Sequence, residues 1–160
     1  MGRARKIRRV CATVAAAAVA YMYLETRRVQ CEERTLVVAG LPRAWSGLTV
    51  LHLSDVHAGT FKTNQRALAK SLAWAQERRL DLVFLTGDII GKPSASRACM
   101  DLLARLRPRL GAFAVTGNHE YGLSKGLLAR PRRVEALWAG SDITLLRDTC
   151  VVLRRPTGEG

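Results

Sequence analysis

The sequence predicts an α/β fold built on a parallel β-sheet, and three apolar runs carry this prediction. Each run is rich in Val, Leu, Phe or Ala, is too short for a globular helix, and ends at Ser or Thr-Gly, as a buried strand does. The runs open the stretches LHLSDVHAG (51–59), LVFLTGD (82–88) and AFAVTGNHE (112–120). About 30 residues separate successive stretches, which is the length of one strand–helix–strand unit.

An apolar helix is expected ahead of this domain. Residues 1–9 contain five basic residues and no acid, and residues 10–24 are apolar apart from Thr13. Such a segment is typical of a membrane anchor or of a cleaved export signal. A buried soluble helix is a third alternative, because the apolar run is shorter than the roughly 20 residues that a full span needs. The basic residues favour a single-pass protein with its N-terminus inside and its main domain outside, or else a secreted one.

Two helices are expected between the three runs, because parallel strands need crossover connections. Asn64 is a candidate cap for a helix over 65–79, whose apolar residues recur at helical spacing. Pro93 opens a second helix that ends before Pro108. Strands are predicted at 35–39, from 48 into the first stretch, and at 82–86, 110–116, 143–146 and 151–153, and part of 123–140 is predicted to be helical. The chain then divides into a basic and apolar segment (1–24), a first strand with its connection (25–47) and the main domain (48–160).

Five polar residues are expected at one edge of the sheet, because ligands gather at the carboxyl ends of the strands in an open α/β sheet. They are Asp55, His57, Asp88, Asn118 and His119. Their mixed oxygen and nitrogen donors suit Mn, Fe or Zn. Each stretch alone is weak evidence, and the three together at matching intervals indicate a metal site.

A pair of divalent cations about 3.5–4 Å apart can polarise a phosphoryl oxygen and generate hydroxide. Asp88 suits the bridging carboxylate, because its strand lies between the other two in sequence. Asp55 and His57, two residues apart at a strand end, would hold one metal. Asn118 would offer its amide oxygen to the second metal. His119 would donate a proton to a leaving alkoxide or hold the phosphate.

The motifs LSDVHAG, LTGDII and VTGNHEY resemble the first three motifs of the calcineurin-like metallophosphoesterases. The N-terminus, ETRRV, the Gly-Leu-Pro turn and GLTVLHLSDVH are similar to a membrane-associated bacterial branch of that superfamily. The branch includes phosphodiesterase-type enzymes, some linked to hydrolysis of UDP-2,3-diacylglucosamine. The resemblance covers roughly residues 25–155.

This resemblance implies a four-layer α/β/β/α sandwich with a two-metal centre that hydrolyses phosphomonoester, phosphodiester or pyrophosphate bonds. Asp55, His57 and Asp88 would hold one metal, while Asp88, Asn118 and later histidines would hold the other. His119 would be the acid that contacts the phosphate. Glu120 is expected to be structural rather than a ligand.

The family carries three further histidines downstream, one alone and two in a Gly-His-x-His motif. This sequence contains only His52, His57 and His119, and His52 is expected in the core or behind the ligands. We therefore expect an N-terminal part of such an enzyme, inactive or nearly inactive on its own. The alternative is an inactive membrane-bound binding protein that keeps a metal half-site.

The charge and the cysteines restrict the other functions. The net charge of +13 attracts anions, including phosphates and anionic lipids. No basic run is interleaved with aromatic residues, so a nucleic-acid-binding module is the weakest hypothesis. The four cysteines form no C-x-x-C pair and are expected to be free thiols, with Cys99 and Cys150 packed and a Cys31–Cys150 bridge as the alternative in an exported domain.

Overall fold

The computed structural model describes residues 2–25, 28–123 and 132–154 of the 160-residue chain. The chain separates into two compact units, Met1–Gln30 and Cys31–Gly160. The second unit contains the sheet and the candidate site, and each unit is described by itself below.

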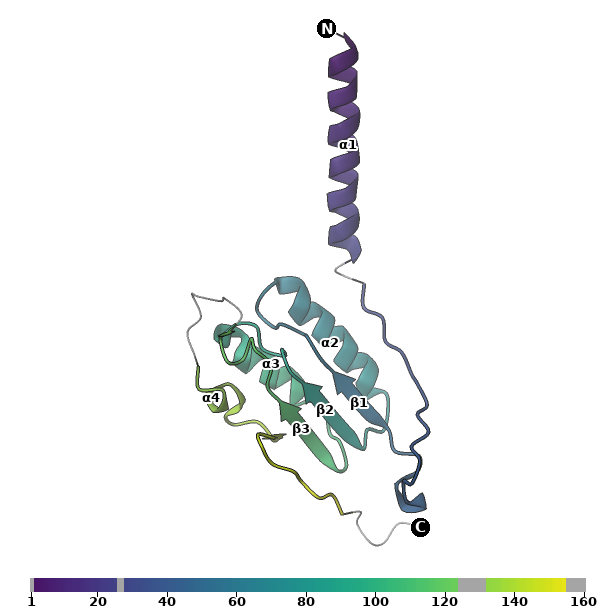
Figure 1. The fold of residues 1–160 in the computed structure, drawn as a ribbon, viewed down its shortest axis with the longest axis vertical. Helices are drawn as coiled ribbons and strands as arrows, with labels where there is room; N and C mark the ends of the chain where they lie inside the picture. Colours follow the sequence, from purple (N-terminus) through teal and green to yellow (C-terminus); the bar gives the residue numbers. More distant parts are fainter. Residues whose placement is uncertain (1, 26–27, 124–131, 155–160) are drawn as a thin grey trace. The chain divides into compact units, whose positions relative to one another are not determined.

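A parallel sheet of four strands forms the centre of the second unit (Figure 1). The strands are β1 (Val50–Leu53), β2 (Leu82–Thr86), β3 (Gly111–Val115) and β4 (Ile143–Leu145). They lie in the order β1-β2-β3-β4, and each neighbouring pair is parallel. The α/β fold and the parallel sheet predicted from the three apolar runs are therefore confirmed.

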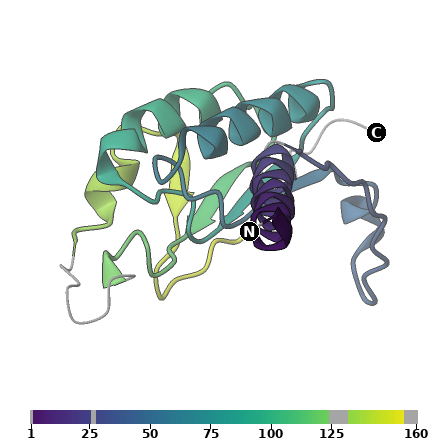
Figure 2. The same ribbon diagram turned by 90° about the horizontal axis from the view of Figure 1, so that it is seen from above.

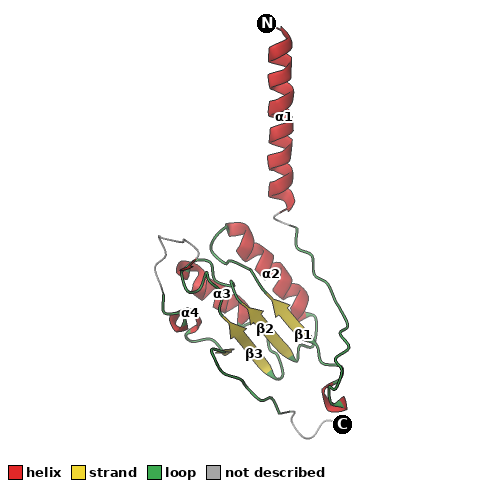
Figure 3. Cartoon of the chain, viewed as in Figure 1, coloured by secondary structure: helices red, strands yellow, loops and turns green. Residues whose placement is uncertain are grey.

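Helices α2 and α3 lie on one face of the sheet, as Figures 2 and 3 show. The helical segments are η1 (Arg43–Trp45), α2 (Lys62–Gln76), η2 (Pro93–Ala95), α3 (Ser96–Leu103) and α4 (Glu135–Trp138). Leu68 and Leu72 of α2 pack with Val83 and Leu85 of β2 in the buried core. Because side chains alternate along a strand, only one set of residues from each strand joins this core.

The opposite face of the sheet carries apolar residues that remain partly exposed. Val50, Phe84 and Val115 are 43%, 37% and 41% exposed, respectively, and the strand register places them on the same face. The rings of Phe84 and Phe113 lie side by side there, with centroids 6.4 Å apart. The family resemblance implies a second sheet on such a face, and the described residues form one sheet.

Two predicted strands are wrong. Residues 35–39 form no strand, and the side chains of Leu36 and Val37 are 80% and 97% exposed. Residues 151–153 are also outside any strand. Both segments have strand-forming residues, but strand propensity needs a neighbouring strand and a buried face to take effect, and neither segment has them among the described residues. The predicted helical part of 123–140 is α4, while 124–131 lie outside the described residues.

The first unit contains one long helix, α1 (Gly2–Glu25). It is the one helix among the described residues that is long and apolar enough to cross a membrane, with a mean hydropathy of 1.3 over its most apolar stretch. None of its residues is buried. A cleaved signal sequence near an N-terminus passes the same test of length and composition, so the helix is consistent with an anchor and with an export signal. The third alternative, a buried soluble helix, does not fit its exposed residues.

The four cysteines are free thiols. Cys99, on the inner face of α3, is fully buried in the core, as predicted, whereas Cys150 is exposed and the prediction that it packs is wrong. Burial raises the pKa of the Cys99 thiol from 9.0 to about 12, and the negative charge of Glu120 adds to this rise. The thiol therefore stays protonated and unreactive at neutral pH.

The burial of Cys99 and the exposure of Cys31 and Cys150 predict how the thiols react in a shortened protein that lacks residues 1–24. We expect Ellman's reagent at pH 8 to label Cys31 and Cys150 within minutes and Cys99 only after unfolding in guanidinium. The unfolded thiol loses its proton near pH 9 and the folded one near pH 12, so the free energy of unfolding should fall as the pH rises above about 9. Rapid labelling of all three thiols in the folded domain would contradict this packing.

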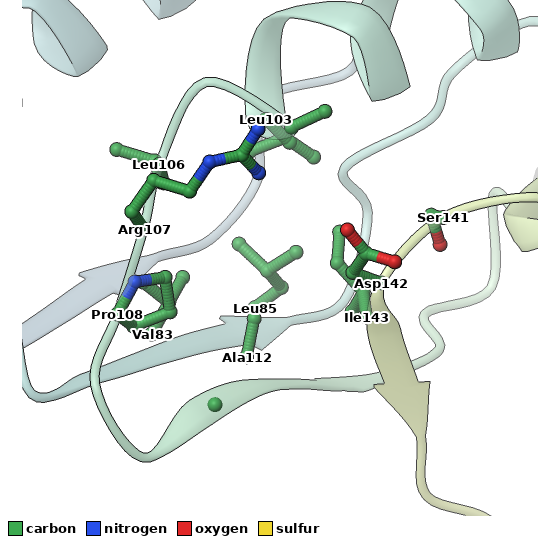
Figure 4. A pocket seen from close by; sticks show the side chains of 12 residues that line it. Val83, Leu85, Leu103, Leu106, Arg107, Pro108, Ala112, Ser141, Asp142 and Ile143 are labelled. Carbon is green, nitrogen blue, oxygen red and sulfur yellow. The ribbon is translucent and has the colours of Figure 1, made fainter.

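A cavity of about 230 Å³ lies between α3, the loop that follows it and the amino ends of β3 and β4. Leu85, Leu103, Leu106 and Ile143 surround it (Figure 4). Helix α3 ends at Leu103, earlier than the predicted helix, which was expected to end before Pro108, and the residues of the loop after α3 line the cavity. It lies at the end of the sheet opposite the candidate site.

Candidate metal centre

The candidate site lies at the carboxyl ends of β1, β2 and β3, where the strands give way to tight turns. Asp55, His57 and Asp88 have φ angles of 54°, 49° and 55°, a region that non-glycine residues seldom adopt. Such conformations persist where surrounding contacts fix them, and they concentrate at functional sites. Three of the predicted site residues share this feature, which no local sequence pattern had indicated.

Three side chains form the centre of the cluster. Donor atoms of His57, Asp88 and His119 lie within 4.8 Å of one another, and each of these residues is half-buried. The imidazole rings of His57 and His119 meet edge to face, with centroids 4.3 Å apart. Imidazole and carboxylate donors gathered in this way are typical of a site for a divalent transition metal.

The two other predicted residues flank this centre. The Asp55 carboxylate lies 3.9 Å from Nε2 of His57, and its side chain is 71% exposed. The Ser54 hydroxyl donates a hydrogen bond to the other Asp55 oxygen. The amide of Asn118 lies against Asp88, and with its nitrogen turned toward that carboxylate it donates to the two oxygens at 3.2 and 2.9 Å. The structure thus brings all five predicted residues together.

Asp88 occupies the middle of the cluster because β2 lies between β1 and β3. The Asp55 amide donates to the Gly87 carbonyl at 3.1 Å, and the His57 amide donates to the Asp88 carbonyl at 2.7 Å. From the other side, the His119 amide donates to Oδ1 of Asp88 at 2.9 Å. The second motif therefore touches both of the others through short hydrogen bonds.

Comparison with known proteins identifies the family. The family model for calcineurin-like phosphoesterases matches residues 48–150, more than half of the chain.

The chain belongs to the calcineurin-like phosphoesterase family.

Several curated metallophosphoesterases are similar to this family member. An uncharacterized metallophosphoesterase of Aquifex aeolicus is 33% identical over 111 residues, which are 68% of this chain and 42% of the relative. The metallophosphoesterase YkuE of Bacillus subtilis is 29% identical over 62% of this chain and 36% of its own length. A zebrafish (Danio rerio) transmembrane protein with a metallophosphoesterase domain is 33% identical over 52% of this chain and 19% of its own length. The chain thus spans less than half the length of these relatives.

Calcineurin-like phosphoesterases typically bind divalent metals, and the residues present here fit such an ion. Nδ1 of His57 is buried and has no hydrogen-bond partner among the described residues. An imidazole nitrogen in that position is costly unless a ligand satisfies it. Together with the carboxylate of Asp88, His57 offers nitrogen and oxygen donors of the kind that divalent transition metals accept, and the imidazole of His119 lies within 4.8 Å of both.

Two residues near the site, His52 and Asn64, differ from their predicted roles. His52 is exposed, and its Nε2 lies 2.6 Å from the Thr86 hydroxyl, so the prediction of a core position is wrong, and the alternative position behind the ligands stays a prediction. Asn64 does not cap α2, which begins at Lys62, two residues ahead of it. Its amide instead donates to the carbonyls of Val56 and His57 at 3.0 and 3.2 Å.

Glu120 is structural, as predicted, but its partners could not be read from the sequence. It is fully buried and accepts hydrogen bonds from three backbone amides of the second and third motifs. Its partners depend on how the turn after β2 packs against the turn after β3, and sequence spacing does not predict that packing.

A recess of about 280 Å³ opens beside Asp55, between the end of β1 and α2. Its walls combine the apolar Leu53 and Leu68 with the polar Ser54, Asn64 and Ser71. Of the five clustered residues, Asp55 is the one that lines this recess.

Proposed function

We propose that this domain is the amino-terminal part of a two-metal hydrolase that cleaves phosphate esters. The observation that supports the proposal most directly is the convergence of Asp55, His57, Asp88, Asn118 and His119 at one edge of the sheet. Membership of the calcineurin-like phosphoesterase family implies a hydrolase and a phosphate-ester substrate.

In this proposal the ligands divide between two ions. Asp55, His57 and Asp88 would hold one ion, while Asp88 and Asn118 would hold the other together with histidines of a longer polypeptide. Ions bound there would favour ionisation of an attacking water and would offset negative charge on the phosphate ester. Mn, Fe and Zn fit this donor set.

His119 acts on the substrate in this scheme. Its imidazole projects from the turn after β3, and its backbone amide is fixed by the carboxylate of Asp88 at 2.9 Å. The edge contact with the ring of His57 restricts the orientation of the imidazole. A protonated imidazole held in this way donates its proton to the leaving alkoxide or hydrogen-bonds the phosphate.

The substrate class we propose is a phosphorylated lipid precursor of the UDP-2,3-diacylglucosamine type. Support comes from α1, which is long and apolar enough to span a bilayer, and from relatives named as transmembrane proteins in zebrafish and cattle. A domain held at a membrane encounters lipid-linked phosphate esters at high local concentration. The alternative is an inactive membrane-bound protein that binds a metal and a phosphate without turnover.

Hydrolysis of bis-p-nitrophenyl phosphate distinguishes the two-metal hydrolase from the inactive binding protein. We expect slow release of nitrophenol by the 160-residue chain, because only Asp88 and Asn118 serve the second ion among the described residues. A polypeptide extended along its reading frame to the length of the relatives is expected to hydrolyse the ester readily with Mn²⁺. EDTA should abolish that activity. Metal binding without hydrolysis by the extended form would favour the inactive binding protein.

The membrane role of α1 predicts a change in partitioning. We expect the full chain to sediment with cell membranes after carbonate washing, and the chain without residues 1–24 to remain in the supernatant, because no other helix among the described residues is long and apolar enough to anchor it. We further propose that the basic residues before the apolar run keep the N-terminus inside. Equal solubility of the two forms would contradict the anchor, and loss of α1 by cleavage would show an export signal instead.

A further inference from the structure

Glu120 is a buried acid of the third motif, next to His119. Its exposure is 0%, and Asp81 is the other buried acid among the described residues. The close group of metal donors consists of His57, Asp88 and His119 and does not include Glu120. Because a charge without partners is strongly disfavoured in a protein interior, the contacts of this carboxylate indicate what it does.

Backbone amides from two motifs supply those contacts. Oε2 of Glu120 accepts hydrogen bonds from the amides of Asp88 at 3.0 Å and Gly117 at 2.9 Å. Oε1 accepts one from the amide of Ile90 at 2.9 Å. An ionised carboxylate is an acceptor at both oxygens, so three converging N–H donors match its chemistry. The side chain therefore joins the turn after β2 to the turn after β3.

The same turn after β2 is also hydrogen-bonded to the first motif. The carbonyl of Asp88 accepts from the amide of His57 at 2.7 Å, and the carbonyl of Ile89 accepts from the amide of Ala58 at 2.8 Å. The turn at residues 88–90 therefore donates N–H groups to Glu120, and its carbonyls accept hydrogen bonds from the first motif. All three motifs are connected through this one side chain.

From these contacts we propose that Glu120 is a positioning residue for the metal centre, a role that rests on the proposed function. Its carboxylate fixes the backbones of Asp88 and Gly117, so that the Asp88 carboxylate and the side chains after Gly117 face the same point. Asp88 needs such support, because its φ of 55° is a conformation that only outside contacts maintain. Glu120 itself touches neither the ion nor the substrate.

Cobalt titration of the 160-residue chain tests this role, because the visible spectrum of bound Co²⁺ reports ligand geometry. Two substitutions separate positioning from charge. Glu120→Gln keeps the length of the side chain but replaces one acceptor oxygen with a donor, which opposes a backbone N–H. Glu120→Asp keeps the charge but is too short to reach all three amides. Glu77→Gln, at an exposed position beyond α2, is the matched control.

We expect both Glu120 variants to bind Co²⁺ roughly 10- to 100-fold more weakly than the wild type, as is usual when a group that orients metal ligands is changed. Their spectra should also differ from that of the wild type, while Glu77→Gln should match it. Wild-type affinity and spectrum in both folded Glu120 variants would overturn the positioning role. Weaker binding by Glu120→Gln alone, with Glu120→Asp unchanged, would also overturn it, because charge would then explain the effect.

Amide hydrogen exchange gives a readout that needs no metal and no variant. In the wild-type chain we expect the amides of Asp88, Ile90 and Gly117 to exchange slowly, like those of the core strands, because they are bonded to a buried carboxylate. Exchange as fast as that of exposed loops would overturn the inference even if the variants fail to fold. Lack of Co²⁺ binding by the wild type combined with slow exchange would instead refute the proposed metal centre, and the positioning role with it.

Discussion

Asp88→Asn is expected to weaken the binding of Mn²⁺ or Zn²⁺ by at least roughly 100-fold. Replacing a group that merely orients a ligand costs 10- to 100-fold in affinity, so replacing a shared ligand should cost no less. Asp88 lies between both neighbouring motifs, and its carboxylate is within 4.8 Å of the donors of His57 and His119. The asparagine lacks the negative charge. Its one oxygen can still accept from the His119 N–H, but its NH2 group replaces the second oxygen and cannot bind a cation.

Isothermal titration calorimetry of the 160-residue chain measures this effect. Asp101→Asn is the matched control, because Asp101 is exposed on α3 and is not part of the metal-donor group. Asp55→Asn should have a smaller effect than Asp88→Asn, since Asp55 is mostly exposed and would serve one ion. Unchanged affinity in both Asp55→Asn and Asp88→Asn, with intact circular dichroism, would refute the assignment of the site.

The sequence was sufficient to predict how the strands are arranged, because that arrangement depends on features that are local and repeated. Short apolar runs with strand-forming residues, separated by helix-length intervals, leave a parallel sheet as the simplest solution. The predicted 82–86 strand agrees with β2 at both ends. The convergence of Asp55, Asp88 and Asn118 follows from that topology alone, without any knowledge of side-chain contacts.

The sequence was not sufficient where tertiary contacts override local preference. Residues 35–39 have strand-forming side chains but no partner, and they remain unpaired. Asn64 has the chemistry of a helix cap, yet its amide bonds the carbonyls of the first motif instead. His52 was placed by strand alternation relative to Asp55, but the strand ends at Leu53 and the turn that follows breaks that alternation.

Gly117→Ala is expected to disrupt the site and to lower the stability of the domain at the same time. A methyl group on Gly117 would lie 2.6 Å from the backbone nitrogen of Asp88 and 2.7 Å from its Cγ, and closer still to Oδ1. Carbon atoms do not approach backbone atoms so closely, so the turn after β3 must move away from the turn after β2. Overpacking of this kind typically costs about 1–3 kcal/mol.

The movement would also break contacts that hold the cluster together. The Gly117 amide would leave Glu120, and the His119 amide would leave the carboxylate of Asp88. We therefore expect metal affinity to fall together with the melting temperature, the latter by roughly 5–10 °C for a loss of about 2 kcal/mol. Asp88→Asn, in contrast, should reduce metal affinity without a comparable loss of stability.

Gly40→Ala is the control that isolates backbone strain from close contact. Gly40 has a φ of 75° and no atom within 4 Å of the position that a methyl group would take, so its substitution costs about 1 kcal/mol of left-handed strain. Thermal unfolding followed by circular dichroism, with Mn²⁺ titration of each variant, compares the two glycines directly. If Gly117→Ala has the same melting temperature and metal affinity as Gly40→Ala, the second and third motifs do not pack as closely as the structure indicates. The close contact between Asp88 and Gly117 would then not determine the geometry of the site.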